Sequence, residues 1–216
     1  MITLHYHPLS SYCWKVLVAL YETETPFVGN VVDLGDAAQR EALLRLWPFG
    51  KFPVITDEGQ VVAESTTILE HLAAHHPRCA ALFPPDRAAR LEARRMDRVF
   101  DLYVHDPMQR LADDRIRAED ARDPLGAPRA RATLATAYAM LERTLQGRPY
   151  AAGETFTIAD CAAAPALHYA NRMVPLGEAH PHVRAYLTRL EARPTFARVL
   201  AEAAPFDHMF PKERDT

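Results

Sequence analysis

The feature that most constrains the fold is a change in residue pattern near residue 78. Seven alanines lie at or before residue 78, and 29 lie after it. Before that point, β-branched and aromatic runs alternate with amphipathic helical patterns, whereas nearly all of the remainder has helical periodicity. With 216 residues, the chain is long enough for one or two domains. The pattern therefore predicts an α/β domain over residues 1–78 and an all-helical domain over residues 86–216.

The first domain is predicted to contain a four-stranded sheet. Ile2, Leu4 and Tyr6 alternate at period two, which is typical of a strand. The predicted strands cover residues 2–8, 27–32, 53–56 and 61–63, and the helices cover 11–22, 36–46 and a segment capped by Ser65 and stopped by Pro77. A strand, crossover helix and parallel strand, followed by a hairpin and a helix, indicate an α/β sheet.

The second domain is predicted to be a bundle of helices. Residues 79–85 contain two prolines and are predicted to form a linker, and residues 117–127 are predicted to form a mobile loop. The predicted helices cover residues 86–104, 128–146, 158–173, 181–192 and 195–203. Thr157 and Asp160 have the spacing of a capping box at the start of the third of these helices.

Composition excludes several classes of function and location. Lys and Arg total 25 and Asp and Glu total 28, so the formal charge of −3 argues against nucleic-acid binding through a basic surface. No apolar run approaches the roughly 18 residues of a membrane helix, so no membrane partner is expected. The N-terminus lacks the pattern of a signal peptide. Three scattered cysteines form no disulfide framework and favour a reducing, cytoplasmic setting.

Three junctions between predicted elements carry candidate chemistry. Ser10 and Ser11 lie where the first strand meets a helix, and helix N-termini stabilise anions. Phe52 and Pro53 begin a strand, and a second strand-to-helix junction carries the acid and hydroxyl of Glu64-Ser65. Taken singly, these residues are more typical of helix caps and strand ends than of a functional site.

Taken together, these segments resemble a known family. The segments that carry the resemblance are Ser10–Val16, Phe49–Ile55, Glu64-Ser65, Gly153–Asp160 and Arg193–Phe196. Over essentially its whole length the chain resembles a cytosolic glutathione S-transferase, and its serine motif is closest in spacing to the zeta class. The resemblance implies a thioredoxin-like N-terminal domain, a helical-bundle C-terminal domain, glutathione as co-substrate and a homodimer.

The resemblance also implies a role for each junction. A free thiol has a pKa near 8.5, and lowering it by about two units requires roughly 2.7 kcal/mol of anion stabilisation. Ser10 or Ser11 would donate a hydrogen bond to the glutathione sulfur, and overlay on the glutaredoxin motif favours Ser10. The distal parts of glutathione would be held by Lys51, the backbone of Phe52 and Pro53, Glu64 and Ser65.

The electrophile is expected in an apolar pocket between the domains. Candidate lining residues are Tyr12, Tyr103, Met108 and the tail residues Phe206, Met209 and Phe210. His71 and His75 are four residues apart on a predicted helix without a third ligand nearby in sequence, so no metal site is predicted.

The sequence therefore predicts a cytoplasmic glutathione transferase that activates the thiolate for attack on a small hydrophobic electrophile, as in detoxification. One alternative is a glutathione-dependent isomerase or dehalogenase, and another is a non-catalytic interaction module with the same fold. A disulfide reductase is disfavoured because positions 10 and 11 lack cysteine.

Overall fold

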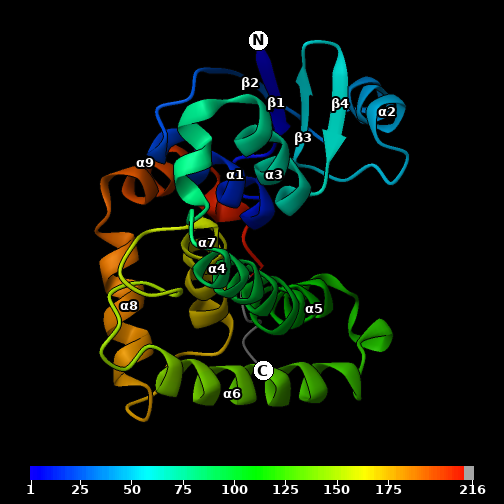
Figure 1. Cartoon of the computed structure of the whole chain (residues 1–216). Helices are drawn as coiled ribbons and strands as arrows, with labels where there is room; N and C mark the ends of the chain where they lie inside the picture. Colours follow the sequence, from blue (N-terminus) through cyan, green and yellow to red (C-terminus); the bar gives the residue numbers. More distant parts are fainter. Residues whose placement is uncertain (212–216) are drawn as a thin grey trace.

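The computed structural model describes residues 1–211 and contains a mixed four-stranded sheet. The strands are β1 (Ile2–Tyr6), β2 (Phe27–Val31), β3 (Val54–Asp57) and β4 (Gln60–Ala63). They lie in the order β2-β1-β3-β4, in which β1 and β2 are parallel and the other pairs are antiparallel. Figure 1 shows this sheet above a group of helices. The predicted sheet is confirmed.

Three helices accompany the sheet: α1 (Ser11–Glu22), α2 (Ala37–Leu46) and α3 (Ser65–His75). The bounds of α1 are those predicted, since Ser10 caps the helix and an apolar stripe buries most of it. One detail differs in α3. Ser65 was predicted to be the cap, but it is the first helical residue, and Glu64 is the N-cap without a side-chain hydrogen bond.

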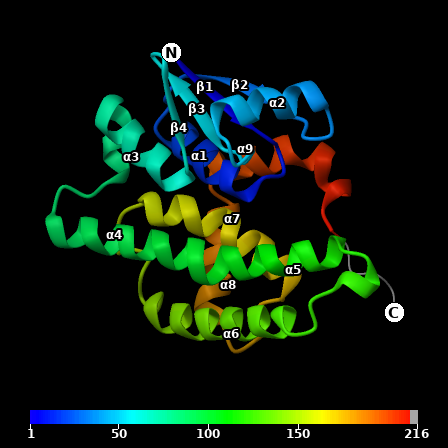
Figure 2. The ribbon, with the colours of Figure 1, turned by 90° about the vertical axis from the view of Figure 1, so that its right-hand side faces the viewer.

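The helical part begins with one long stretch that the sequence pattern did not fully predict. It consists of α4 (Arg87–Val99), a π-helical segment over residues 100–105 and α5 (Asp106–Ile116). The prediction ended this helix at residue 104 and placed no helix over residues 106–116. Pro107 lacks the N–H that a regular α-helix uses, and the π turn before it lets the chain continue as a helix. Figure 2 shows α4 and α5 running on as a single stretch.

Four later α-helices lie close to their predicted bounds: α6 (Gly126–Thr144), α7 (Ile158–Met173), α8 (Pro181–Glu191) and α9 (Pro194–Ala203). Three 3-10 segments have no counterpart in the prediction: η1 (Pro77–Leu82), η3 (Glu119–Ala121) and η4 (Ala204–Met209). Two predictions were wrong in part. The segment predicted as a linker begins inside the 3-10 helix η1, because the Cys79 side chain is buried against the hydroxyls of Thr23 and Thr25. The predicted loop over 117–127 contains η3 and the start of α6.

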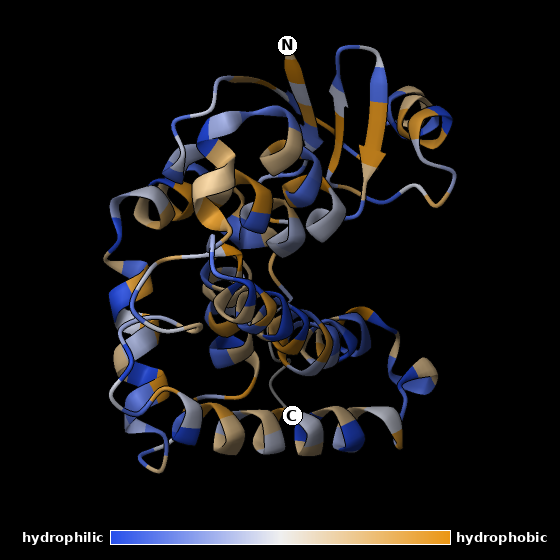
Figure 3. Cartoon of the chain, in the orientation of Figure 1, coloured by the Kyte–Doolittle hydropathy of each residue, from blue (hydrophilic) through white to orange (hydrophobic). Residues whose placement is uncertain are grey.

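One continuous core joins the sheet domain to the helices. α1 packs against α3, α7 and α9, and α7 packs in turn against α4 and α8. Trp14 lies at this junction, where its ring contacts Tyr169 and Phe196 and its indole N–H donates to the carbonyl of Pro8. Figure 3 shows that the helices carry both hydrophobic and hydrophilic residues, as expected for amphipathic helices around a core. Among residues 1–211, no helix is both long and apolar enough to cross a membrane.

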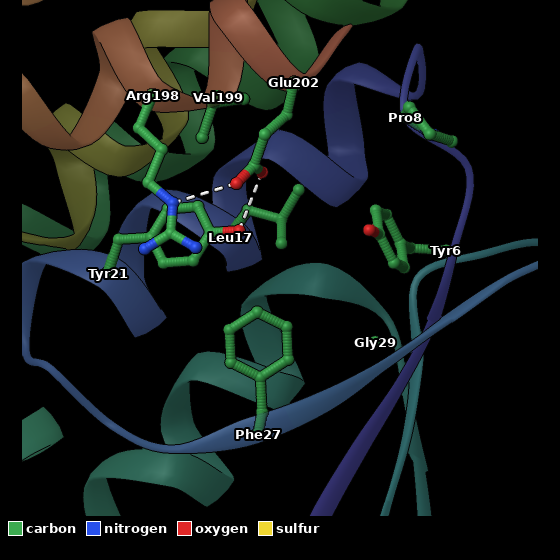
Figure 4. Close-up of a pocket in the computed structure, with 9 residues that line it drawn as sticks. All are labelled: Tyr6, Pro8, Leu17, Tyr21, Phe27, Gly29, Arg198, Val199 and Glu202. Carbon is green, nitrogen blue, oxygen red and sulfur yellow. Dashed lines mark hydrogen bonds and ion pairs between the residues drawn. The ribbon is translucent and has the colours of Figure 1, made fainter.

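A polar hollow marks where α9 docks on the sheet domain. It encloses about 340 Å³ between β1, β2, α1 and α9 (Figure 4). Tyr21 donates a hydrogen bond to Glu202 at 2.7 Å, and the Arg198 guanidinium lies 3.9 Å from the Tyr21 ring and pairs with the same carboxylate. Since these charged groups satisfy one another, we interpret the hollow as a docking contact between the domains.

A buried aspartate holds the start of α7. Asp160 accepts hydrogen bonds from the backbone N–H groups of Ala151 and Thr157 at 2.9 and 2.8 Å. The Tyr186 hydroxyl donates to the same carboxylate at 2.5 Å. Asp160 is fully buried, so this acceptor links α7, the preceding loop and α8. The predicted capping box is confirmed.

We expect Asp160→Ala to lower the free energy of unfolding by about 3 kcal/mol or more, because four buried donors, the Thr157 hydroxyl included, lose their acceptor and each unsatisfied group costs about 1–3 kcal/mol. Urea denaturation measures the loss. Asp86→Ala is the matched control, since Asp86 caps the exposed start of α4 through one N–H. An equal loss in both variants would contradict the role of Asp160.

Candidate functional site

Two of the three junctions singled out in the sequence, Phe52-Pro53 and Glu64-Ser65, line one hollow between the domains, here called the central hollow. Near the first junction Tyr12 lines this hollow, whereas Ser10 and Ser11 do not. The central hollow encloses about 450 Å³. The residues that line it come from α1, the segment before β3, the start of α3 and the α4–π stretch: Tyr12, Trp47, Lys51, Phe52, Pro53, Glu64, Ser65, Thr66, Thr67, Arg98, Asp101 and Leu102. A hollow of this size suits a small polar ligand.

The two candidate serines have different surroundings at the start of α1. Ser10 is the N-cap, and its hydroxyl oxygen accepts a hydrogen bond from the backbone N–H of Cys13 at 3.3 Å. The Ser10 hydroxyl also lies beside the buried Cys13 thiol, and a hydrogen bond from it partly offsets the rise that burial causes in the pKa of that thiol. Ser11 is 6% exposed, and its hydroxyl lies 2.5 Å from Nε2 of His105. Ser10 therefore faces a weakly accepting thiol at the helix N-terminus, whereas Ser11 is engaged by a histidine.

His105 is a site residue that the sequence analysis missed. It comes from the π-helical segment, 94 residues after Ser11, and no spacing in the sequence connects the two. Burial, with a smaller effect from the charge of Lys15, lowers its pKa to about 3. The Tyr12 ring stacks on it at a centroid distance of 3.7 Å. At neutral pH an uncharged imidazole thus lies between Ser11 and Tyr12.

A second, more apolar hollow lies on the other side of this stack, here called the apolar hollow. It encloses about 140 Å³ and is lined by Leu9, Ser11, Met108, Gln109, Ala112, Ile116, Tyr169, Met209, Phe210 and Pro211. The rings of Tyr169 and Phe210 stack at 5.2 Å, with the Arg172 guanidinium 3.8 Å from the centre of the Phe210 ring. Tyr12 lines the central hollow and Ser11 lines the apolar hollow, so the two hollows flank the first turn of α1.

The residues expected to line an electrophile pocket do not all lie in one hollow. Met108, Met209 and Phe210 line the apolar hollow. Phe206 lies edge-on to the His7 ring, and Tyr103 lines a separate hollow between α5 and α6.

The Glu64-Ser65 junction has an unusual backbone. Glu64 has a φ of 69°, in the left-handed region, which costs about 1–3 kcal/mol for a residue with a Cβ. Glu64 is exposed, while Ser65 is buried at the first position of α3, where backbone N–H groups lack helical partners. The junction therefore places an acid and a hydroxyl beside a helix N-terminus, a combination that binds an amino acid at both its ammonium and its carboxylate groups.

The Phe52–Pro53 junction forms the opposite wall of the central hollow. The peptide bond between Phe52 and Pro53 is cis. The Phe52 ring is stacked 6.1 Å from His7 of the adjacent segment, and Lys51 is exposed at the edge of the hollow. Lys51 and Phe52 both line the central hollow.

A buried cluster of charges lies next to the central hollow, which its members Thr66, Arg98 and Asp101 also line. Lys15 is 1% exposed and lies 2.6 Å from Asp97 and 2.8 Å from Asp101. Its ammonium group also donates to Thr66 at 2.8 Å. Arg98 pairs with Asp101 and is half exposed toward the hollow. The sequence analysis missed this cluster, for which the only signal was a lysine inside the apolar run of α1.

We expect His105→Gln to flatten the pH dependence of stability. The unfolded chain binds a proton at His105 below pH 6.5, whereas the folded chain does so only near pH 3, so this contribution to stability is complete above pH 6.5 and lost as the pH falls toward 3. Between pH 7 and pH 5 the wild type should lose about 2 kcal/mol more than the variant. Denaturation at both pH values measures this. His182→Gln, an exposed control, should keep the wild-type slope, and an unchanged slope in His105→Gln would contradict the neutral histidine.

Two family models match this chain. Residues 4–80 match the model described as "Glutathione S-transferase, N-terminal domain". Residues 109–189 match the model described as "Glutathione S-transferase, C-terminal domain".

Individual relatives cover nearly the whole chain. A glutathione S-transferase of Pseudomonas putida is 28% identical over 208 residues, which cover 94% of this chain and 92% of the relative. FtsZ-localized protein A of Caulobacter vibrioides is 29% identical over 218 residues, with the same coverage. The solved structure of a glutathione S-transferase from Methylobacterium radiotolerans, in complex with glutathione sulfonate, is 30% identical, has a TM-score of 0.80 and covers 100% of this chain and 97% of that one.

Proposed function

Since the chain belongs to the glutathione S-transferase family, we propose that the central hollow binds glutathione and that the thiolate attacks an electrophile held in the apolar hollow. The chain is a glutathione transferase by its relatives and by its similarity to a transferase structure that contains a glutathione derivative. The observation that supports the placement is that the Phe52-Pro53 and Glu64-Ser65 junctions line one hollow together with Tyr12, two residues after Ser10.

Each end of glutathione has a matching group in this proposal. The Glu64 carboxylate accepts hydrogen bonds from the ammonium group of the γ-glutamyl end. The hydroxyl and N–H of Ser65 donate to the carboxylate of that γ-glutamyl end. The backbone of the Phe52-Pro53 segment pairs with the cysteinyl unit in the manner of a strand edge. Lys51 binds the glycine carboxylate. Arg98, half exposed at the same hollow, is a second cation suited to a carboxylate.

Ser10 is the proposed donor to the sulfur. Its hydroxyl, which in this structure faces only the weakly accepting thiol of Cys13 among the described side chains, would together with the N-terminus of α1 supply the anion stabilisation that a thiolate needs. Ser11 has its hydroxyl committed to His105, which favours a positioning role for Ser11 at the boundary of the two hollows. In this arrangement the sulfur lies at the first turn of α1 and faces the apolar hollow.

The remaining parts of the proposal concern the setting of the enzyme. We propose domains over residues 1–78 and 86–216, the last five residues of which lie outside the described part. We also propose a cytoplasmic detoxification role and a homodimer. Large exposed apolar side chains such as Phe49 and Leu91, 71% and 69% exposed, are suited to a subunit contact.

We expect Glu64→Ala and Ser65→Ala each to raise the dissociation constant for glutathione ten- to hundredfold, because each removes a charge-assisted contact worth about 1.5–3 kcal/mol. The pKa of the bound thiol should hardly change. Titration calorimetry and the pH dependence of thiolate absorbance measure the two quantities. Glu58→Ala is the matched control, since Glu58 is an exposed glutamate that also has a positive φ, of 48°.

Two outcomes of that experiment would contradict the assignment. If Glu64→Ala raised the pKa of the bound thiol and left the affinity unchanged, the assignment of Glu64 to the γ-glutamyl end would be wrong. If the wild-type chain bound no glutathione at millimolar concentration, an interaction module with this fold would be favoured over an enzyme.

We expect Ser10→Cys to gain thiol–disulfide exchange with glutathione mixed disulfides and to lose conjugation. A cysteine at the N-cap of α1 has a lowered pKa, and its thiolate attacks the mixed disulfide and takes up the glutathionyl group as the partner thiolate leaves. Conjugation falls because a second thiolate opposes the first. Both activities are assayed in Ser10→Cys and in the control Ser11→Cys. A gain in Ser11→Cys alone would place the sulfur beside Ser11.

A further inference from the structure

A second cluster of polar side chains lies at the end of the sheet opposite the central hollow. Asp57 is the last residue of β3, whereas Pro53 of the central hollow comes directly before the first residue of that strand. His71 lies in α3, and His76 directly follows its last residue. Figure 1 shows the β3–β4 turn at the top of the sheet, away from the helical domain. The fold thus brings together three residues that are separated by up to 19 positions.

The three side chains converge on one point. Nε2 of His71 lies 3.1 Å from Oδ2 of Asp57, and Nε2 of His76 lies 2.6 Å from the same oxygen. The three candidate ligand atoms all lie within 4.8 Å of one another. A Zn²⁺ ion bound tetrahedrally at its usual distances holds such atoms about 3.4 Å apart. Small side-chain shifts therefore convert the hydrogen-bonded cluster into a coordination site.

Burial and charge also suit a dication. Asp57 is 4% exposed, and its Oδ1 has no hydrogen-bond partner among residues 1–211; the α-amino group of Met1 lies 3.9 Å from it. A small hollow of about 90 Å³ opens at the cluster and is also lined by Glu58 and His75. With neutral histidines the two carboxylates give this hollow a net negative charge, which a divalent cation compensates.

We propose that Asp57, His71 and His76 bind one Zn²⁺ ion, with the fourth position left for water. Two imidazole nitrogens and one carboxylate oxygen are a usual ligand set for zinc, while magnesium prefers oxygen ligands. On binding, each histidine carries its ring hydrogen on Nδ1 and presents Nε2 to the ion.

The ion would act as a cross-link within the sheet domain. Asp57 belongs to the sheet, and the two histidines belong to α3 and the residue after it, so bound zinc ties the far end of β3 to the end of the helix whose beginning carries Ser65. An ion that binds only the folded chain stabilises it by mass action. The site is independent of the proposed glutathione chemistry, because it shares no residue with the central hollow.

The test uses the full chain without a histidine tag, stripped of metal by a chelator and kept free of glutathione. Calorimetric titration with Zn²⁺ should show one ion per chain, and Mg²⁺ should show no binding. At a Zn²⁺ concentration a hundredfold above the dissociation constant, the melting temperature should rise by about 5 to 11 °C.

Variants localise the ion. His71→Gln, His76→Gln and Asp57→Asn should each raise the dissociation constant for Zn²⁺ at least about tenfold. His182→Gln is the matched control, because His182 also pairs with a carboxylate, that of Glu142, but lies outside the cluster. The two histidine variants decide the result if Asp57→Asn does not fold.

Three outcomes would overturn the proposal. They are no Zn²⁺ binding by the wild type, equal affinity in His71→Gln, His76→Gln and His182→Gln, and a sulfur-to-metal charge-transfer band when Co²⁺ replaces Zn²⁺. Such a band would place the ion on a cysteine.

Discussion

The buried ammonium group of Lys15 is the interaction on which the site depends. An isolated charge in a protein interior is strongly unfavourable, so Lys15 requires both Asp97 and Asp101 close by. Lys15 belongs to α1, and the two aspartates belong to the α4–π stretch. The pairing therefore fixes the position of the helical part against the sheet domain. The shape of the hollow between them is fixed as a consequence. Thr66, bonded to the same ammonium, brings the start of α3 into this arrangement.

The π-helical segment determines which side chains reach the site. An extra residue in a helical turn rotates all later side chains about the helix axis, and here the turn precedes Pro107. Asp101 and His105 both belong to this segment, and both point into the buried region beside α1. Pro107 would end an ordinary helix, but here it follows a π turn. That same turn carries the neutral His105 that contacts Ser11.

Local sequence patterns were enough to predict the elements of the sheet domain. They could not predict contacts between residues of the two domains. Ser10 and the apolar stripe after it were enough to define α1, and Thr157 with Asp160 defined the start of α7. Pro107 concealed α5, even though Met108, Leu111 and Ala112 have helical spacing. His105, Arg98 and the Asp57–His76 pair could not be found from the sequence, because their partners are distant along the chain and only folding brings them together. The φ of Glu64 has no sequence signal either.

All three cysteines are buried and none forms a disulfide. Cys13 lies one turn from Ser10 but is fully buried, and burial raises the pKa of its thiol to about 12. Burial likewise raises the pKa of the Cys161 thiol well above its ordinary value, and Cys79 is enclosed by two threonine hydroxyls. Electrophiles react with thiolates wherever they meet them. A protein that delivers a foreign thiolate to such compounds is therefore protected from its own substrates, because none of its cysteines is both ionised and accessible.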